Sequence, residues 1–118
     1  MIYTHALETI VRRDCSDDPV LARFRAALEE LYGKRIDRVV LFGSRARGEA
    51  RADSDYDVAL FLHGLKADRW QELTNLATIT EPILEETGAV LNVLPLSAGL
   101  HRERTPLMHE IRRDGLDL

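Results

Sequence analysis

The chain has 118 residues, of which 45% are hydrophobic and 31% charged, and its formal net charge at pH 7 is −4. This length fits one globular domain over residues 1–118. The single cysteine, Cys15, cannot form an internal disulfide, so we expect the protein in the cytoplasm. The acidic balance argues against general nucleic-acid binding, and the lack of a long apolar run or a signal-peptide pattern argues against a membrane protein.

The N-terminal part of the chain is predicted to be helical. A short helix is expected over residues 4–13, and Asp17 or Asp18 is expected to cap a second helix with Pro19 in its first turn. Gly33 is placed to end this second helix, because glycine readily adopts the left-handed conformation. Its apolar stripe consists of Leu21, Phe24, Leu28 and Leu31.

Two apolar runs in the middle of the chain are predicted to be buried strands, over residues 36–42 and 55–62. Glycine or polar residues bound both runs. Between them, a short helix is expected to begin near Gly43-Ser44 and to fade by Gly48. A polar loop over residues 48–54 then returns the chain to the second strand.

The C-terminal half alternates between helix and strand. A helix is predicted over residues 66–87, with a kink or break before Pro82, which cannot donate a backbone hydrogen bond. A third strand follows over 89–95, and a last helix begins at Thr105-Pro106. The order of elements predicts an α/β fold, with helices packed on a small mixed sheet of three or four strands. The stripe expected on the 66–87 helix consists of Trp70, Leu73, Ala77, Thr80 and Leu84.

The residues that could bind a metal or a phosphate lie at the end of the first predicted strand and at the start of the second. Asp55 and Asp57 point to one face of the predicted strand, because side chains alternate along a strand. Two carboxylates on one face can bind a hard divalent cation. Gly43 and Ser44 offer backbone N–H groups and a hydroxyl ahead of a helix, which is a common phosphate-binding arrangement. Together these residues predict a site for Mg²⁺ and a nucleotide.

Three arginines, Arg45, Arg47 and Arg51, occur between the two halves of this site. Guanidinium groups bind phosphate well, so we expect at least one of them to contact phosphate or a partner. The alternative is that they belong to a solvated loop. For the centre as a whole, the alternative is a tight turn beside a solvent-facing pair of aspartates.

At these residues the sequence resembles a known family. Gly43-Ser44, ten intervening residues and Asp55-x-Asp57 are similar to the signature of the DNA polymerase β-like nucleotidyltransferases. The segments GSRARG and SDYD are most similar to the minimal nucleotidyltransferases, small prokaryotic proteins that often act as antitoxins. The resemblance implies the polymerase β-like fold, with Asp55 and Asp57 as catalytic metal ligands. It also implies that Gly43, Ser44, Arg45 and Arg47 bind the nucleotide.

The resemblance further implies a reaction and a partner. AMP would pass from ATP to a hydroxyl, typically of a tyrosine in a HEPN-type ribonuclease toxin, with the help of two Mg²⁺ ions. In this family a third carboxylate from a later strand completes the acceptor-side metal site, and here we expect Asn92 in that place. A neutral amide cannot act as a general base, so the second metal is expected to bind weakly. The other acids considered for this place are Glu49, Asp53, Glu81, Glu85 and Glu86.

Three functions therefore stay open from the sequence. The first is an Mg²⁺-dependent enzyme that moves AMP to a partner protein and acts as an antitoxin. The second is a weak or inactive relative that neutralises its partner by binding alone, and the substitution at Asn92 favours it. The third is a small-molecule transferase of the aminoglycoside-modifying type, which normally has more chain for substrate capture.

Overall fold

The computed structural model describes residues 17–65 and 69–118, so the helix expected over 4–13 and Cys15 lie outside the described residues. The described elements follow the predicted alternation of helix and strand. In chain order they are α2 (Pro19–Tyr32), η1 (Gly33–Arg35), β1 (Ile36–Phe42), α3 (Gly43–Ala46), β2 (Tyr56–Leu62), α4 (Trp70–Thr87), β3 (Leu91–Ser97), η2 (Ala98–Arg102), α5 (Pro106–Asp114) and β4 (Leu116–Asp117).

The strands form a mixed four-stranded sheet in the order β3-β2-β1-β4. β1 is antiparallel to β2 and to β4, whereas β2 and β3 are parallel. The predicted α/β architecture with a small mixed sheet is confirmed. The register places Asp57 of β2 between Phe42 of β1 and Asn92 of β3, so residues far apart in the sequence meet at one end of the sheet.

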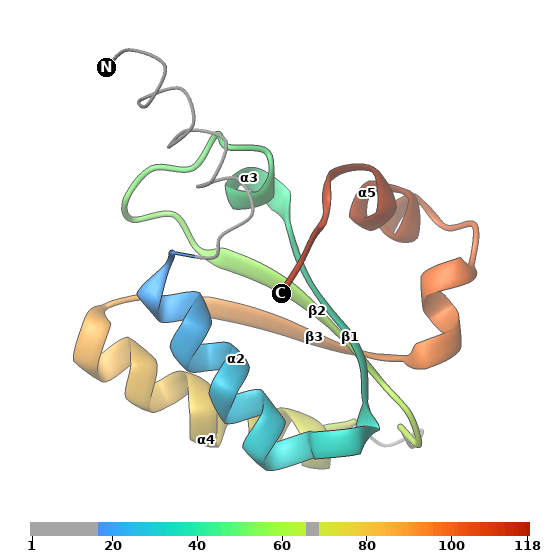
Figure 1. The fold of residues 1–118 in the computed structure, drawn as a ribbon, viewed down its shortest axis with the longest axis horizontal. Coiled ribbons are helices and arrows are strands. Elements are labelled where there is room, and N and C mark those ends of the chain that lie inside the picture. The colour runs from blue at the N-terminus through green and yellow to red at the C-terminus, as the bar shows by residue number, and fades with distance from the viewer. Residues whose placement is uncertain (1–16, 66–68) are drawn as a thin grey trace.

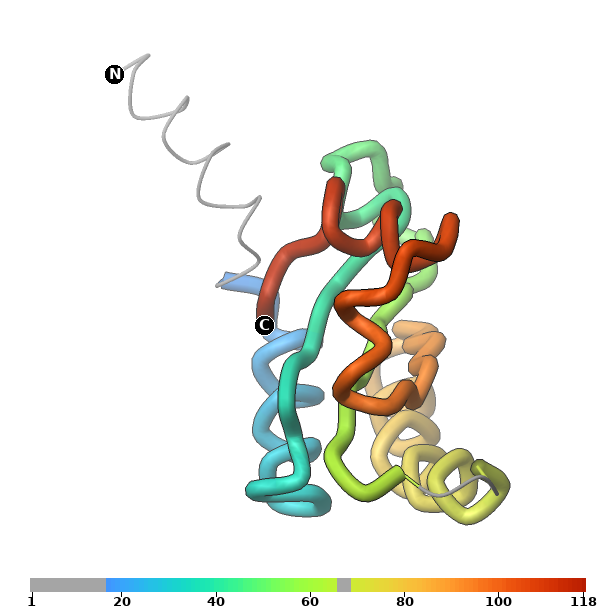
Figure 2. The backbone as a smooth tube through the Cα atoms, turned by 90° about the vertical axis from the view of Figure 1, so that its right-hand side faces the viewer, coloured from blue at the N-terminus to red at the C-terminus, as the bar shows by residue number. Residues whose placement is uncertain are grey.

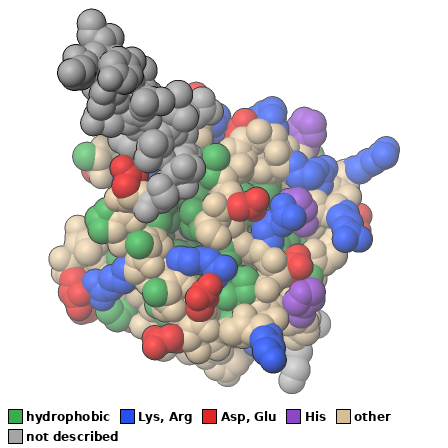
Figure 3. All heavy atoms as spheres, in the orientation of Figure 1, with side chains coloured by type: hydrophobic (Ala, Val, Ile, Leu, Met, Phe, Trp, Pro, Cys, Tyr) green, Lys and Arg blue, Asp and Glu red, His purple; other side chains and the backbone are tan. Residues whose placement is uncertain are grey.

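Alternation along the strands gives the sheet two apolar faces. Val58, Leu60 and Leu62 pack with α2 and α4, whereas Ala59 and Phe61 pack with α5. Fully burying a side chain of this size contributes roughly 1.5–3 kcal/mol, so both faces stabilise the fold. α2 and α4 lie at the opposite end of the molecule from α3 and α5 (Figures 1 and 2). Figure 3 shows Lys, Arg and His side chains gathered on the side where η2 and α5 lie.

The helix boundaries follow local signals in the sequence. Asp18 caps α2 by accepting hydrogen bonds from Val20 N and Leu21 N. Gly33 follows α2 with φ +53°, and Thr105 caps α5 through Met108 N. These caps are the ones that the sequence predicts.

α4 differs from the prediction in two respects. It is one continuous helix that contains Pro82, so the helix does not break there, whereas the alternative, a kink, stays a prediction. One missing donor is outweighed by the burial of Ile83 and its neighbours. The buried face is also different, because the expected stripe lies along the flank of the helix and Leu73 is 45% exposed. The residues that α4 buries are Glu72, Leu76, Ile79 and Ile83.

The C-terminus adds a short strand that the sequence analysis did not locate. β4 pairs with the outer edge of β1, and Leu118 N donates to Val39 O at 2.9 Å. β3 therefore remains the outer strand on the opposite side of the sheet, alongside α4 (Figure 1). Among the described helices, none has the length and apolar character that a membrane span requires.

Candidate active site

Two parallel strands bring two carboxylates and one amide together. Asp55 directly precedes β2, Asp57 is the second residue of β2, and Asn92 is the second residue of β3. The Asn92 Nδ2 donates to Asp55 Oδ2 at 3.1 Å and to Asp57 Oδ1 at 3.3 Å. Asp55 and Asn92 are exposed and Asp57 is half-buried, so the cluster opens to solvent at the end of the sheet.

Gly43 packs directly against this cluster. It has φ +75°, and a Cβ added there would lie 2.6 Å from Asp57 Oδ2, so only glycine fits without displacing the carboxylate. Ser44 follows in the first turn of α3, whose N-cap residue, Phe42, supplies no side-chain hydrogen bond. The first amides of a helix have no intrahelical acceptor, so the N–H groups at the start of α3 have no partner within that helix, and Gly43 places this helix start beside Asp57. The two predicted halves of the site are thus adjacent.

The donor atoms of the cluster suit a hard cation. In the described part of the chain, no three His, Cys, Asp or Glu side chains are placed to hold a metal, and the third polar side chain of this cluster is the amide of Asn92. A half-turn of the Asn92 side chain exchanges its NH₂ group for its carbonyl oxygen. Two carboxylates and an amide oxygen are ligands that Mg²⁺ and Ca²⁺ accept. Asp55 and Asp57 therefore fit the implied cation, with Asn92 as a neutral third group.

Arg45 is committed to the connection that leads into β2. Its guanidinium donates to the backbone oxygens of Ser54, at 2.7 and 2.9 Å, and of Ala52, at 3.2 Å. The same group lies 3.8 Å from the centre of the Tyr56 ring, close enough for a cation–π interaction. Tyr56 is buried, and its hydroxyl donates to Asp18 Oδ2 at 2.9 Å. In this arrangement Arg45 orders the segment that positions Asp55.

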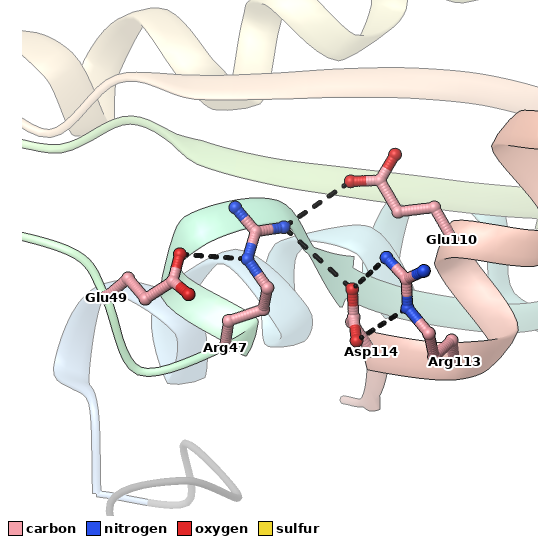
Figure 4. A network of polar contacts seen from close by, with 5 residues as sticks. All are labelled: Arg47, Glu49, Glu110, Arg113 and Asp114. Carbon is pink, nitrogen blue, oxygen red and sulfur yellow. Dashed lines mark hydrogen bonds and ion pairs between the residues drawn. The ribbon is translucent and has the colours of Figure 1, made fainter.

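Arg47 lies in a network of ion pairs that connects α3 to α5 (Figure 4). It contacts Glu49 at 3.0 Å, Glu110 at 3.5 Å and Asp114 at 3.9 Å. A hydrogen bond from Arg113 lowers the pKa of Asp114, so this carboxyl is charged at neutral pH. Each exposed pair contributes little, but the network connects α5 to the C-terminal end of α3. A role of Arg45 or Arg47 in nucleotide binding stays a prediction.

Two cavities lie beside the part of the chain that runs from α3 to the start of β2. The larger, about 800 Å³, lies on the α2 side and contains neither Asp55 nor Asp57 in its wall. The smaller, about 410 Å³, is bounded by Asp57 and Asn92, and we assign the chemistry to it. Its remaining wall is apolar or uncharged and consists of Phe42, Leu73, Leu76, Ala77, Thr80, Leu91, Val93 and Leu94.

The sequence analysis missed the contribution of α4 to this cavity. Leu73, Ala77 and Thr80 occur at helical spacing and were expected in the core, yet they line the cavity beside Asn92. The available signal was a second apolar stripe on the same helix, formed by Leu76, Ile79 and Ile83. A helix with two such stripes can bury only one against the sheet, so the other must face a groove or solvent.

Comparisons with known proteins agree with the fold. The sequence model of the family described as polymerase beta, nucleotidyltransferase matches residues 27–116. One similar solved structure is a toxin–antitoxin with AMP-PNP, with a TM-score of 0.53 and 18% identity over 80% of this chain and 68% of that chain. Another is a toxin–antitoxin MntA-HpeT mutant, with a TM-score of 0.53 and 17% identity over 80% and 68% of the two chains. No curated protein sequence matches the chain.

Proposed function

Since the chain belongs to the polymerase beta nucleotidyltransferase family, we propose that it transfers AMP from ATP to a hydroxyl of a partner protein in the presence of Mg²⁺. The observation that carries this proposal is the contact between Gly43 and Asp57. It places the start of α3 beside a carboxylate of the Asp55–Asp57 pair, an arrangement that suits a metal–triphosphate complex.

The residues of the chain would divide the work as follows. The amides of Gly43 and Ser44, with the Ser44 hydroxyl, would hold the distal phosphates, and Asp55 and Asp57 would hold the cation. Bound Mg²⁺ would neutralise the triphosphate and the leaving pyrophosphate. The acceptor oxygen would attack the α-phosphorus while the bond from that phosphorus to the oxygen shared with the β-phosphate breaks, and pyrophosphate would leave. The acceptor proton would leave to water past Asp55, the exposed carboxylate.

We propose a toxin of the HEPN type as the partner that supplies the hydroxyl. The two toxin–antitoxin structures named above share the fold, which supports an antitoxin role.

A second candidate function is neutralisation of the partner by binding alone. Asn92 favours it, because the amide contributes no negative charge to a cation and cannot take a proton from the acceptor. In that case Asp55 and Asp57 would be retained as a nucleotide site with little or no turnover.

Labelled ATP separates the two candidates. The chain and a co-expressed HEPN-type toxin are incubated with ATP labelled at the α-phosphate or, in parallel, at the γ-phosphate. The transferase proposal predicts label on the toxin from the α-phosphate alone, and loss of labelling when Asp55→Asn and Asp57→Asn are combined. If the wild type transfers no label and the double variant still neutralises the toxin, binding alone is the function.

A further inference from the structure

The structure leaves the outer edge of β3 open directly beside the candidate site. Tyr56 N donates to Val90 O at 2.9 Å, and the residues that bond to a given neighbour alternate along a parallel strand. Asn92 therefore directs its backbone groups toward β2, whereas Leu91 and Val93 direct theirs outward. Within the described residues, no strand lies beyond β3.

Pro95 limits how much of this edge can pair. By the same alternation, the backbone of Pro95 faces outward. Proline has no N–H to donate, so within a sheet it usually occupies such an edge position. Only the Leu91–Val93 end can offer both donors and acceptors to another strand. That end is the one that carries Asn92.

The flank of α4 forms an apolar wall above this edge. Leu73 and Leu84 are each 45% exposed, and Leu73, with Ala77 of the same helix, lines the cavity that reaches Asp57 and Asn92. One cavity thus joins an apolar wall, an open strand edge and the Asp57 carboxylate. Among the described residues that line it, Asp57 alone is charged, so an apolar occupant with neutral or basic polar groups complements it.

We propose that an extended segment of the partner protein pairs with β3 at Leu91–Val93 and thereby delivers its hydroxyl to the site. This inference rests on the proposed function. An added strand lies about 4.8 Å from its neighbour and alternates its side chains between the two faces. One set of side chains would pack against Leu73 and Ala77, while a side chain beside Asn92 on the opposite face would point at Asp55 and Asp57.

A second copy of this chain does not suit the same edge. Pairing of two β3 strands would cover the cavity at Asp57 and Asn92 in both copies, because that cavity wraps the edge itself. The acceptor would then have no route to either site. The geometry therefore favours a peptide segment of a different protein, in the mode of strand addition.

A peptide with strand-like patterning tests the edge without knowledge of the natural partner. The probe is an acetylated, amidated octapeptide of alternating valine and lysine with one central tyrosine, and its control carries N-methyl groups on alternate amides. In ¹⁵N-labelled protein, the first peptide should shift the amide signals of Leu91 and Val93 at millimolar concentration. The methylated peptide should leave them unchanged.

Two variants of the chain with one matched control complete the test. Val93→Pro removes an outward donor without touching the β2 pairing, and Leu73→Lys places a charge in the wall. Each should weaken peptide binding about tenfold, the loss expected for one or two hydrogen bonds or a lost apolar contact. Leu31→Lys is the control, because Leu31 is 40% exposed but faces the separate cavity between α2 and α4. It should bind the peptide as the wild type does.

The outcomes separate this inference from the proposed function. Calorimetry with ATP and Mg²⁺ should give the same affinity for the wild type and Leu31→Lys. If the peptide binds at β3 but the wild type does not bind ATP, the proposed function fails and the docking edge stands. Absence of shifts at Leu91 and Val93, equal binding by Val93→Pro, or a protein dimer that Val93→Pro dissociates would overturn the docking proposal.

Discussion

The side-chain amide of Asn92 donates a hydrogen bond of 3.1 Å to the carboxylate of Asp55, across the parallel pair of strands β2 and β3. This contact, and the one at 3.3 Å to Asp57, offset part of the repulsion between the two carboxylates. The amide thus stabilises the carboxylate pair when no cation is bound, and it leaves a bound cation with fewer negative ligands.

Asn92→Asp should therefore exchange intrinsic stability for cation affinity. Without Mg²⁺ we expect the variant to lose about 1–2 kcal/mol of unfolding free energy, because two hydrogen bonds are replaced by like charges. Added Mg²⁺ should raise its Tm more than that of the wild type, as measured by calorimetry. Asn75→Asp on α4 is the control and should show no added response to Mg²⁺. Equal Mg²⁺ responses of Asn92→Asp and the wild type would remove Asn92 from the metal site.

Gly43→Ala and Gly48→Ala form a matched pair. Both glycines have φ +75°, so both variants bear the cost of a left-handed alanine, about 1–2 kcal/mol. Only at Gly43 would the new Cβ meet Asp57, whereas Gly48 has no neighbour within 4 Å. Urea unfolding should show a further loss of about 1–3 kcal/mol for Gly43→Ala, and ATP binding should weaken in this variant alone. Equal losses in the two variants would show that the contact with Asp57 is not tight.

Arg45→Met tests whether this arginine acts by ordering the connection before β2. The variant keeps an apolar chain against Tyr56 but loses the hydrogen bonds to the backbone of Ser54 and Ala52. We expect faster proteolytic cleavage within residues 48–54 and weaker Mg²⁺ binding at Asp55. Arg51→Met, at an exposed position in the same connection, should change neither. Unchanged cleavage together with weaker ATP binding would instead assign Arg45 to the nucleotide, as the sequence suggested.

His101 should make stability depend on pH. Burial, followed by the positive charges of Arg38 and Arg112, lowers the pKa of His101. The unfolded chain therefore binds a proton near pH 6.5 that the folded chain takes up only at lower pH, so stability falls as the pH drops below that value. Urea unfolding should show that His101→Gln reduces this slope, whereas His109→Gln, at an exposed position on α5, retains it. An unchanged slope in His101→Gln would assign the effect to other groups.

The sequence predicted the parts of the fold that depend on local signals. Asp18, Gly33 and Thr105 end or begin helices through their own backbone and side-chain chemistry, and the apolar runs mark the buried strands. The proximity of Asp57 and Asn92 could be anticipated, because the carboxylates begin one strand and the amide lies near the start of the next.

Other features depended on tertiary packing and could not be derived locally. α4 carries two apolar stripes, and only the position of the sheet decides that Leu76 is buried while Leu73 is exposed. The pairing of β4 with β1 involves two residues, too few for a periodic pattern. Two partners of Arg47, Glu110 and Asp114, lie on α5, more than sixty positions away in the sequence, so no spacing rule could connect them.

The most direct test of the central claim is calorimetric titration of ATP into the wild type and Asp57→Asn, with and without Mg²⁺. We expect Mg²⁺-dependent binding by the wild type and loss of that dependence in Asp57→Asn, with the unfolding free energy largely preserved. Asp117→Asn, at an exposed position on β4, should bind as the wild type does. Equal Mg²⁺-dependent affinities of the wild type and Asp57→Asn would contradict the assignment of this carboxylate pair to the metal–nucleotide site.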